Sequence, residues 1–83
     1  MRPTLYQFEE CPYCAKVRVK LEEKKISYEK VNVPRNREDG LRKLLAEKSG
    51  VFTVPVLKVV DENGAEKYIG ESAVILKFLE GNF

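Results

Sequence analysis

The chain has 83 residues, which is enough for one compact domain and too few for two, so we expect a single domain over residues 1–83. Its 43% hydrophobic and 34% charged residues supply a core and exclude a disordered chain. The 15 basic and 13 acidic side chains are interspersed, and a formal charge of +2 without a basic cluster predicts neither a nucleic-acid partner nor a membrane-surface partner.

Residues 5–8 form the first predicted strand, a short run dominated by large apolar and aromatic side chains. This segment follows Met1 so closely that it leaves no room for a cleavable signal peptide. No apolar run elsewhere approaches the roughly 20 residues of a membrane span. We therefore expect a cytoplasmic protein without a membrane partner.

The two cysteines of the chain, Cys11 and Cys14, come soon after this strand and are separated by two residues. Pro12 between them suits the first turn of a helix, because its fixed φ fits there and its missing N–H is not needed. Apolar side chains then recur at helical spacing. We expect a helix from the motif to about Lys25.

A second strand and a second helix follow. Residues 26–33 alternate with period two, as a strand would. Asn36, with Asp39 three residues later, is a capping-box-like start for the helix. Gly50 supplies its end, and Gly40 inside it weakens it slightly.

The last part of the chain predicts a β-hairpin and a third helix. Residues 54–60 are rich in β-branched side chains, and a turn sequence separates them from a second strand over residues 66–69. After Gly70, Ser72 can cap a helix that ends near Gly81. Because a βαβ unit has parallel strands and a tight hairpin is antiparallel, the four-stranded sheet is mixed. The predicted fold is α/β, ordered β-α-β-α-β-β-α, with three helices flanking the sheet.

A reactive dithiol is the strongest functional signal in the chain. A disulfide across so small a loop would constrain little of the unfolded chain, so a structural role explains the cysteines poorly. Zinc needs four ligands drawn mainly from Cys and His, and with no His and no third Cys we expect no metal unless another molecule completes the site. At the helix start the dipole and free N–H groups favour a thiolate at Cys11, while Cys14 is shielded one turn further in. We predict that Cys11 attacks and Cys14 resolves, as in a thioredoxin-like redox site.

The sequence resembles the glutaredoxins. The C-P-Y-C sequence of residues 11–14 is their dithiol motif, and Thr53-Val54-Pro55 matches a loop of that family. There the proline is cis, and the main chain of the residue before it pairs with the peptide part of glutathione. The resemblance therefore implies a thioredoxin-like fold and assigns Val54 and Pro55 to a glutathione groove. Tyr13 is expected to flank the sulfur and pack on the substrate. Without the family, a trans bond before Pro55 is the commoner expectation.

A second resemblance is to the N-terminal domain of the glutathione S-transferases. It is carried by residues 5–8, the cysteine motif, residues 16–18 and residues 70–75. In that family a Glu-Ser pair holds the γ-glutamyl end of glutathione, which implies this role for Glu71 and Ser72. The free N–H groups of a helix start at Ser72 suit a carboxylate, and an ordinary N-cap explains the serine equally well.

Two positions depart from the glutaredoxin pattern. Phe8 stands where typical glutaredoxins carry a lysine, and Ala73 stands where they carry an aspartate. Another cation would then have to meet the glycyl carboxylate of glutathione, although each candidate is equally well explained as a solvated charge. The candidates are Arg35, Arg37, Arg42 and Lys48.

The resemblance implies a glutathione-dependent thiol–disulfide oxidoreductase that reduces protein disulfides and glutathione mixed disulfides through Cys11 and Cys14. Two alternatives stay open: a glutaredoxin-like reductase fed by thioredoxin reductase, and a carrier in which two chains bridge an iron–sulfur cluster through Cys11 and glutathione. A complete glutathione transferase is disfavoured, because such enzymes use a helical second domain to bind the electrophile. The expected partners are glutathione and disulfide-bearing or glutathionylated proteins, and the expected state is a monomer.

Overall fold

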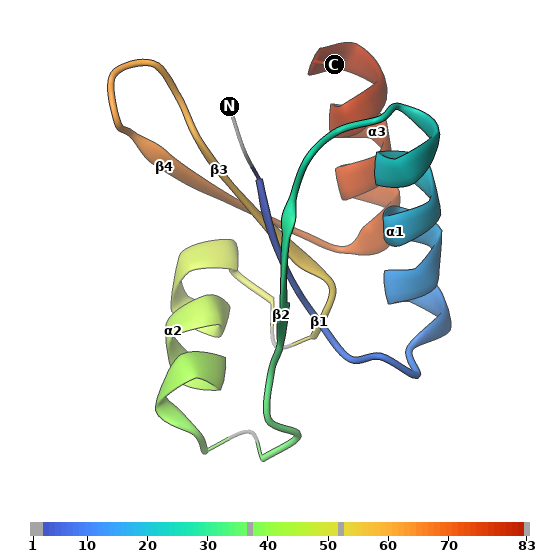
Figure 1. Ribbon diagram of the computed structural model, residues 1–83. Coiled ribbons are helices and arrows are strands. Elements are labelled where there is room, and N and C mark those ends of the chain that lie inside the picture. The colour runs from blue at the N-terminus through green and yellow to red at the C-terminus, as the bar shows by residue number, and fades with distance from the viewer. Residues whose placement is uncertain (1–2, 37, 52, 83) are drawn as a thin grey trace.

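The computed structural model describes residues 3–36, 38–51 and 53–82 (Figure 1). The strands are β1 (Thr4–Gln7), β2 (Glu29–Asn32), β3 (Val56–Val60) and β4 (Glu66–Gly70). The helices are α1 (Pro12–Glu23), α2 (Gly40–Ser49) and α3 (Ser72–Asn82). This order confirms the predicted α/β fold. Within the described residues, no helix has both the length and the apolar character needed to cross a membrane.

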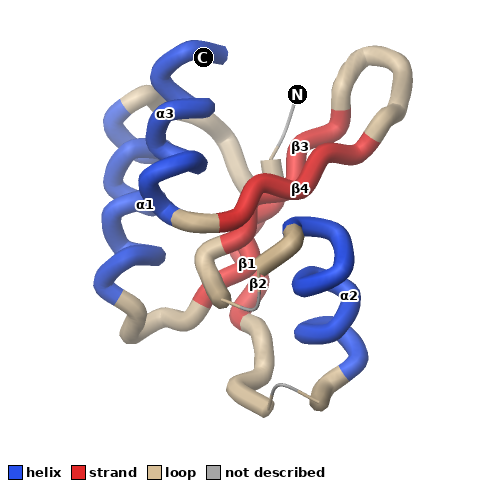
Figure 2. Tube along the Cα trace, turned by 180° about the vertical axis from the view of Figure 1, so that it is seen from behind, coloured by secondary structure: helices blue, strands red, loops and turns tan. Residues whose placement is uncertain are grey.

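The four strands form one mixed sheet in the order β2-β1-β3-β4. β1 runs parallel to β2, whereas β3 is antiparallel to both β1 and β4. In the register, Leu5 lies opposite Lys30 of β2 and Leu57 of β3. Figure 2 shows that α1 and α3 cover one face of the sheet and that α2 covers the other. The predicted combination of a parallel βαβ unit with an antiparallel hairpin is therefore confirmed.

The alternation of β1 divides its side chains between the two faces of the sheet. Leu5 points toward α1 and α3, while Tyr6 and Phe8 pack on the α2 side. The larger core cluster contains Leu5, Val17, Leu21, Leu57, Val59, Ile69, Ile75 and Leu79. The smaller cluster contains Val33, Leu45 and Val56. Burial of apolar surface on both faces therefore fixes the register of the central strand, because a shift by one residue would exchange its two faces.

The start of α2 differs from the prediction. The helix begins at Gly40, and its N-cap is Asp39, whose Oδ1 accepts a hydrogen bond from the N–H of Leu41 at 2.9 Å. Asn36 instead accepts from the N–H of Glu38 at 3.0 Å and forms a local turn before the helix. Gly40 therefore occupies the first helical position, where the predicted interior penalty does not apply.

The end of α1 is also slightly different from the prediction, because the helix stops at Glu23 rather than near Lys25. Lys25 has a left-handed φ of 56°, and its N–H donates to the Glu22 carbonyl at 3.1 Å. The N–H of Ile26 donates to the Leu21 carbonyl at 2.9 Å. These two bonds are a Schellman motif, which ends a helix by satisfying its last carbonyls.

Two strands start later than predicted, and one helix end agrees with the prediction. β2 begins at Glu29 rather than at residue 26, and β3 begins at Val56 rather than at residue 54. The residues before Val56 form a loop rather than part of the ladder, and this loop contributes to the candidate site below. Gly50 ends α2 with a left-handed φ of 81°, as its position after the helix predicted.

Candidate functional site

Cys11 lies between β1 and α1 and is the N-cap residue of the helix. Its Sγ accepts a hydrogen bond from the backbone N–H of Cys14 at 3.4 Å, and Pro12 starts the helix as predicted. The Cys11 side chain is partly exposed. A sulfur in this position lies at the positive end of a helix and in contact with solvent, so a substrate can reach it.

Cys14 lies one turn further into α1 and is fully buried. Burial is the main cause that raises the pKa of Cys14 to about 11, and its contact with the Cys11 side chain acts in the same direction. The main chain of Phe8 and the charge of Arg18 act in the opposite direction. Both cysteines are free thiols. Cys14 is therefore a protonated, shielded thiol at neutral pH, and Cys11 is the sulfur that a substrate can reach.

Two acidic residues precede Cys11, and each contacts a cation. Nζ of Lys30 lies 2.6 Å from Oε1 of Glu9, and this hydrogen bond holds the pKa of Glu9 below its usual range. Nη2 of Arg35 lies 3.2 Å from Oε2 of Glu10. Because both carboxylates are paired and exposed, their repulsion of a thiolate at Cys11 is reduced.

The residues predicted to contact glutathione line one open pocket of about 290 Å³. They are Tyr13, Val54, Pro55, Glu71 and Ser72, and Thr53 completes the lining. They come from three separate segments: the first turn of α1, the loop before β3, and the junction of β4 with α3. The pocket therefore adjoins the helix turn that carries the two cysteines.

The loop before β3 contributes Thr53, Val54 and Pro55 to this pocket. The Val54-Pro55 peptide bond is cis, as the resemblance to glutaredoxins implied. Pro55 is buried, whereas Val54 is partly exposed. Within the described residues, no hydrogen bond engages the N–H or the C=O of Val54. Both groups are therefore available to a ligand.

The junction of β4 with α3 contributes Glu71 and Ser72 to the same pocket. Glu71 has a left-handed φ of 65°, which is uncommon for a residue other than glycine. Its carbonyl accepts from the N–H of Ile75 at 3.0 Å, so Ser72 is the first helical residue rather than the predicted N-cap. Just before this turn, a Cβ on Gly70 would overlap Cγ2 of Val51. The turn is therefore held close to the segment that leads to the other wall of the pocket.

Phe8, which stands where typical glutaredoxins carry a lysine, makes cation–π contacts with two arginines. The ring centroid lies 4.7 Å from Cζ of Arg35 and 5.2 Å from Cζ of Arg42. Arg42 is 8% exposed and donates to a backbone carbonyl at 2.9 Å, whereas Arg35 is exposed. Lys48 lies in the last turn of α2, and Arg37 is outside the described residues. Arg35 is therefore the more accessible arginine of this pair.

A polar cluster beside the cysteine motif was not predicted from the sequence. Gln7 at the end of β1 is fully buried. Its Nε2 donates to Oδ1 of Asn32 at 2.7 Å, and its Oε1 accepts from Arg18 of α1. The polar residue inside a short apolar strand was the available signal, but its partners lie on other elements at no fixed spacing.

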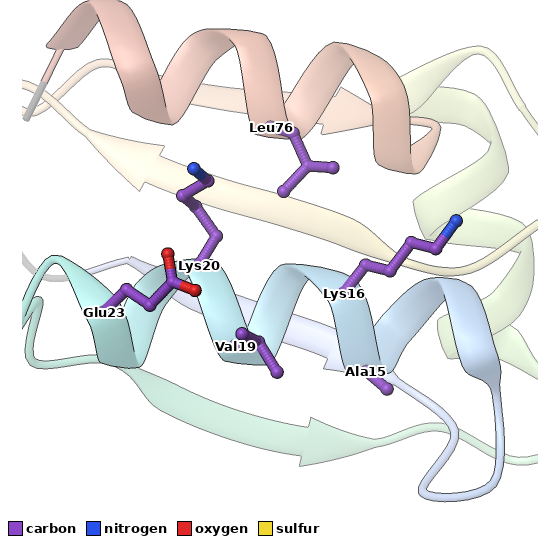
Figure 3. Close-up of a pocket in the computed structure, with 6 residues that line it drawn as sticks. All are labelled: Ala15, Lys16, Val19, Lys20, Glu23 and Leu76. Carbon is purple, nitrogen blue, oxygen red and sulfur yellow. The ribbon is translucent and has the colours of Figure 1, made fainter.

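A second pocket, of about 350 Å³, lies between α1 and α3 (Figure 3). Its lining consists of Ala15, Lys16, Val19, Lys20, Glu23 and Leu76. Leu76 points from α3 toward α1, and Lys20 pairs with Glu80 of α3 at 3.1 Å. This lining includes neither cysteine and none of the residues predicted to bind glutathione. The pocket is therefore separate from the candidate site.

Comparison with known proteins identifies the family of the chain. Residues 5–83 match the family model of the glutathione S-transferase N-terminal domain. The chain belongs to this family. Glutaredoxin 1 of Rickettsia conorii is 33% identical over 51 residues, which make up 61% of this chain and 50% of that protein. This glutathione S-transferase N-terminal domain thus spans about half the length of the curated relatives it matches. The predicted similarity to both families is confirmed.

Solved structures show the same fold. The trimeric glutathione transferase TDR1 of Leishmania has a TM-score of 0.76 and 29% identity, over 95% of this chain and 17% of that chain. A glutathione S-transferase of Methylobacterium radiotolerans, solved in complex with glutathione sulfonate, has a TM-score of 0.74 and 30% identity. The match spans 96% of this chain and 34% of the chain of that transferase. This family member therefore has a thioredoxin-like fold.

Proposed function

We propose that this chain is a glutathione-dependent thiol–disulfide oxidoreductase in which Cys11 and Cys14 form the reactive dithiol. The observation that carries the proposal is that a pocket suited to a peptide thiol adjoins the helix turn that Cys11 caps. The family of the chain and its similarity to a glutaredoxin over part of its length support glutathione as the thiol.

Glutathione would lie in the pocket of about 290 Å³ with its cysteine directed at Cys11. Its peptide part would pair with the main chain of Val54, which has no other hydrogen bond in the described residues. The γ-glutamyl carboxylate would meet the free N–H groups at the start of α3 around Ser72, and the γ-glutamyl ammonium would meet the Glu71 carboxylate. Arg35 would bind the glycyl carboxylate.

With a glutathionylated protein, one cysteine is sufficient. The Cys11 thiolate attacks the glutathione sulfur, and the protein sulfur leaves as a thiolate that takes up a proton. A second glutathione thiolate then attacks the glutathione sulfur bound to Cys11. Oxidised glutathione leaves, and the Cys11 thiolate is restored.

With a protein disulfide, both cysteines take part. The Cys11 thiolate attacks one substrate sulfur, and the other leaves as a thiolate. Cys14 then attacks Cys11 Sγ, which releases the remaining substrate sulfur and forms a Cys11–Cys14 disulfide. Two glutathione molecules reduce this disulfide and leave as oxidised glutathione. We place this reaction in a monomeric single domain of the cytoplasm, where the glutathione pool keeps such dithiols reduced.

The decisive experiment compares Cys11→Ser and Cys14→Ser on two substrates, a glutathionylated peptide and a protein disulfide, with glutathione and glutathione reductase. Cys11→Ser should lose both activities. Cys14→Ser should keep its activity on the glutathionylated peptide, because a second glutathione attacks the sulfur bound to Cys11 without help from Cys14. It should lose most of its activity on the protein disulfide, because release of that substrate depends on the intramolecular attack by Cys14. Activity in Cys11→Ser would refute the proposed nucleophile.

A parallel assay with thioredoxin reductase identifies the electron donor. If the wild type is active only with thioredoxin reductase, that enzyme and not glutathione is the electron donor. The assay is included because Phe8 stands where typical glutaredoxins carry a lysine. A visible absorbance band in anaerobically purified protein would instead indicate the iron–sulfur carrier.

A further inference from the structure

The guanidinium of Arg18 is fixed one helical turn after Cys14. Its Nη1 donates to Oε1 of Gln7, and its Nη2 donates to the main-chain oxygen of Glu9 at 3.3 Å. Gln7 is fully buried, and its Nε2 is taken by Oδ1 of Asn32 at 2.7 Å, which directs its Oε1 toward the guanidinium. Three elements, β1, β2 and the loop before α1, therefore hold one arginine of α1 in place.

The oxygens that hold Arg18 are neutral. The carboxylate of Glu9 is bound instead by Nζ of Lys30 at 2.6 Å and by Nδ2 of Asn32 at 3.4 Å. Among the described residues, no carboxylate lies within ion-pair distance of the Arg18 guanidinium. Its charge is therefore not cancelled by a direct partner and acts on nearby groups that can become negative, including Cys14.

Cys14 needs such help, because it must become a thiolate inside the protein. Burial raises the pKa of Cys14 to about 11, so only a small fraction of the molecules carries this thiolate at pH 7. Besides burial, the groups that act on the charge of its sulfur are the Cys11 side chain, the main chain of Phe8 and the guanidinium of Arg18, which lies one turn further along the same helix. Of these, Arg18 is the one with a positive charge.

We propose that Arg18 is a positioning residue for the resolving step: its guanidinium, held by Gln7 and Glu9, stabilises the thiolate of Cys14 as it attacks Cys11. This inference rests on the proposed dithiol reaction and deepens it. In the step, the Cys14 thiol gives its proton to solvent, its sulfur bonds to Cys11 Sγ, and the bond from Cys11 to the substrate sulfur breaks. The substrate sulfur leaves with the electron pair of that bond, so the mixed disulfide is the sole oxidant.

The coloured disulfide dithiobis(nitrobenzoate) separates the two sulfurs without glutathione. Cys11 releases the first nitrothiobenzoate in a phase whose rate depends on reagent concentration. Cys14 then attacks the mixed disulfide and releases the second in a phase that does not depend on it. Absence of a second phase in Cys14→Ser establishes the assignment. Because the probe is not glutathione, failure of the glutathione proposal leaves this test intact.

Arg18→Gln keeps a polar side chain and removes the charge, and Lys20→Gln is a matched loss of charge elsewhere on α1. We expect Arg18→Gln to slow the second phase about three- to tenfold at pH 7 and displace its pH profile upward, since the cation is partly exposed. The rate of the first phase should stay within about twofold of the wild-type rate. Arg18→Lys should restore most of the wild-type rate of the second phase. Gln7→Glu, which places a carboxylate on the guanidinium, should slow the second phase in a protein that keeps Arg18.

A direct titration complements the kinetics. In a Cys11→Ser background, the ¹³Cβ chemical shift of Cys14 is followed against pH. The midpoint of this titration should move to higher pH on adding Arg18→Gln and should not move on adding Lys20→Gln. Equal second-phase rates in Arg18→Gln and Lys20→Gln would overturn the proposal. So would equal slowing of both phases, or an Arg18→Lys variant no faster than Arg18→Gln, because either would mean that Arg18 only supports the loop. If Arg18→Gln does not fold, an unchanged second phase in Gln7→Glu overturns it.

Discussion

The burial of Cys14 should make the stability of the reduced protein fall in alkaline solution. Burial raises the pKa of this thiol from 9.0 to about 11, so the folded protein holds the proton more tightly than the unfolded chain does. A raised pKa contributes stability that is complete below the unfolded value and is lost as the pH rises through the folded value. By linkage, the loss is about 1 kcal/mol at pH 10 and approaches about 3 kcal/mol well above pH 11.

Urea unfolding at pH 7 and at pH 10 measures this loss. Comparing Cys11→Ser with the double variant Cys11→Ser/Cys14→Ser prevents disulfide formation and isolates the buried thiol. Burial also raises the pKa of Tyr6, but that titration is common to both variants and cancels in the comparison. Between the two pH values, we expect the free energy of unfolding of the single variant to fall by up to about 1 kcal/mol more than that of the double variant. Cys11 contributes part of the pKa shift of Cys14 and is absent from both variants, so the difference stays below the full linkage value. Equal losses would refute the reasoning that burial keeps Cys14 protonated.

Three further predictions test the pocket walls and the start of α2. Gly70→Ala should lower the free energy of unfolding by about 1 to 3 kcal/mol and weaken glutathione binding in calorimetry, because its methyl group has no room. Gly40→Ala is the control, because nothing lies within 4 Å of a Cβ added there, and it should change the free energy of unfolding by no more than about 0.5 kcal/mol. Equal losses in the two variants would contradict the packing argument. Arg35→Gln should raise the KM for glutathione about three- to tenfold with little change in kcat, and an unchanged KM would exclude Arg35 from the site. Asp39→Ala should cost about 1 kcal/mol in thermal or urea unfolding and Asn36→Ala much less; the reverse order would move the helix cap to Asn36.

Local patterns were sufficient for the order of the elements and the position of the dithiol. The short apolar run of β1, Pro12 at the start of α1 and Gly50 after α2 each act through neighbours in the chain, so their effects can be read along the sequence. The resemblance to glutathione-binding families then selected the pocket residues and the cis bond before Pro55. None of these inferences required knowing which elements pack together.

Tertiary structure alone decided the start of α2 and the surroundings of the reactive sulfurs. Asn36 and Asp39 have similar capping chemistry, and only the folded path of the chain places Asp39 at the first turn. Arg18 meets Gln7 across α1 and β1, at no spacing that a sequence pattern can reveal. The protonation of Cys14 depends on how completely the packed core excludes water, and that exclusion exists only after the helices cover the sheet.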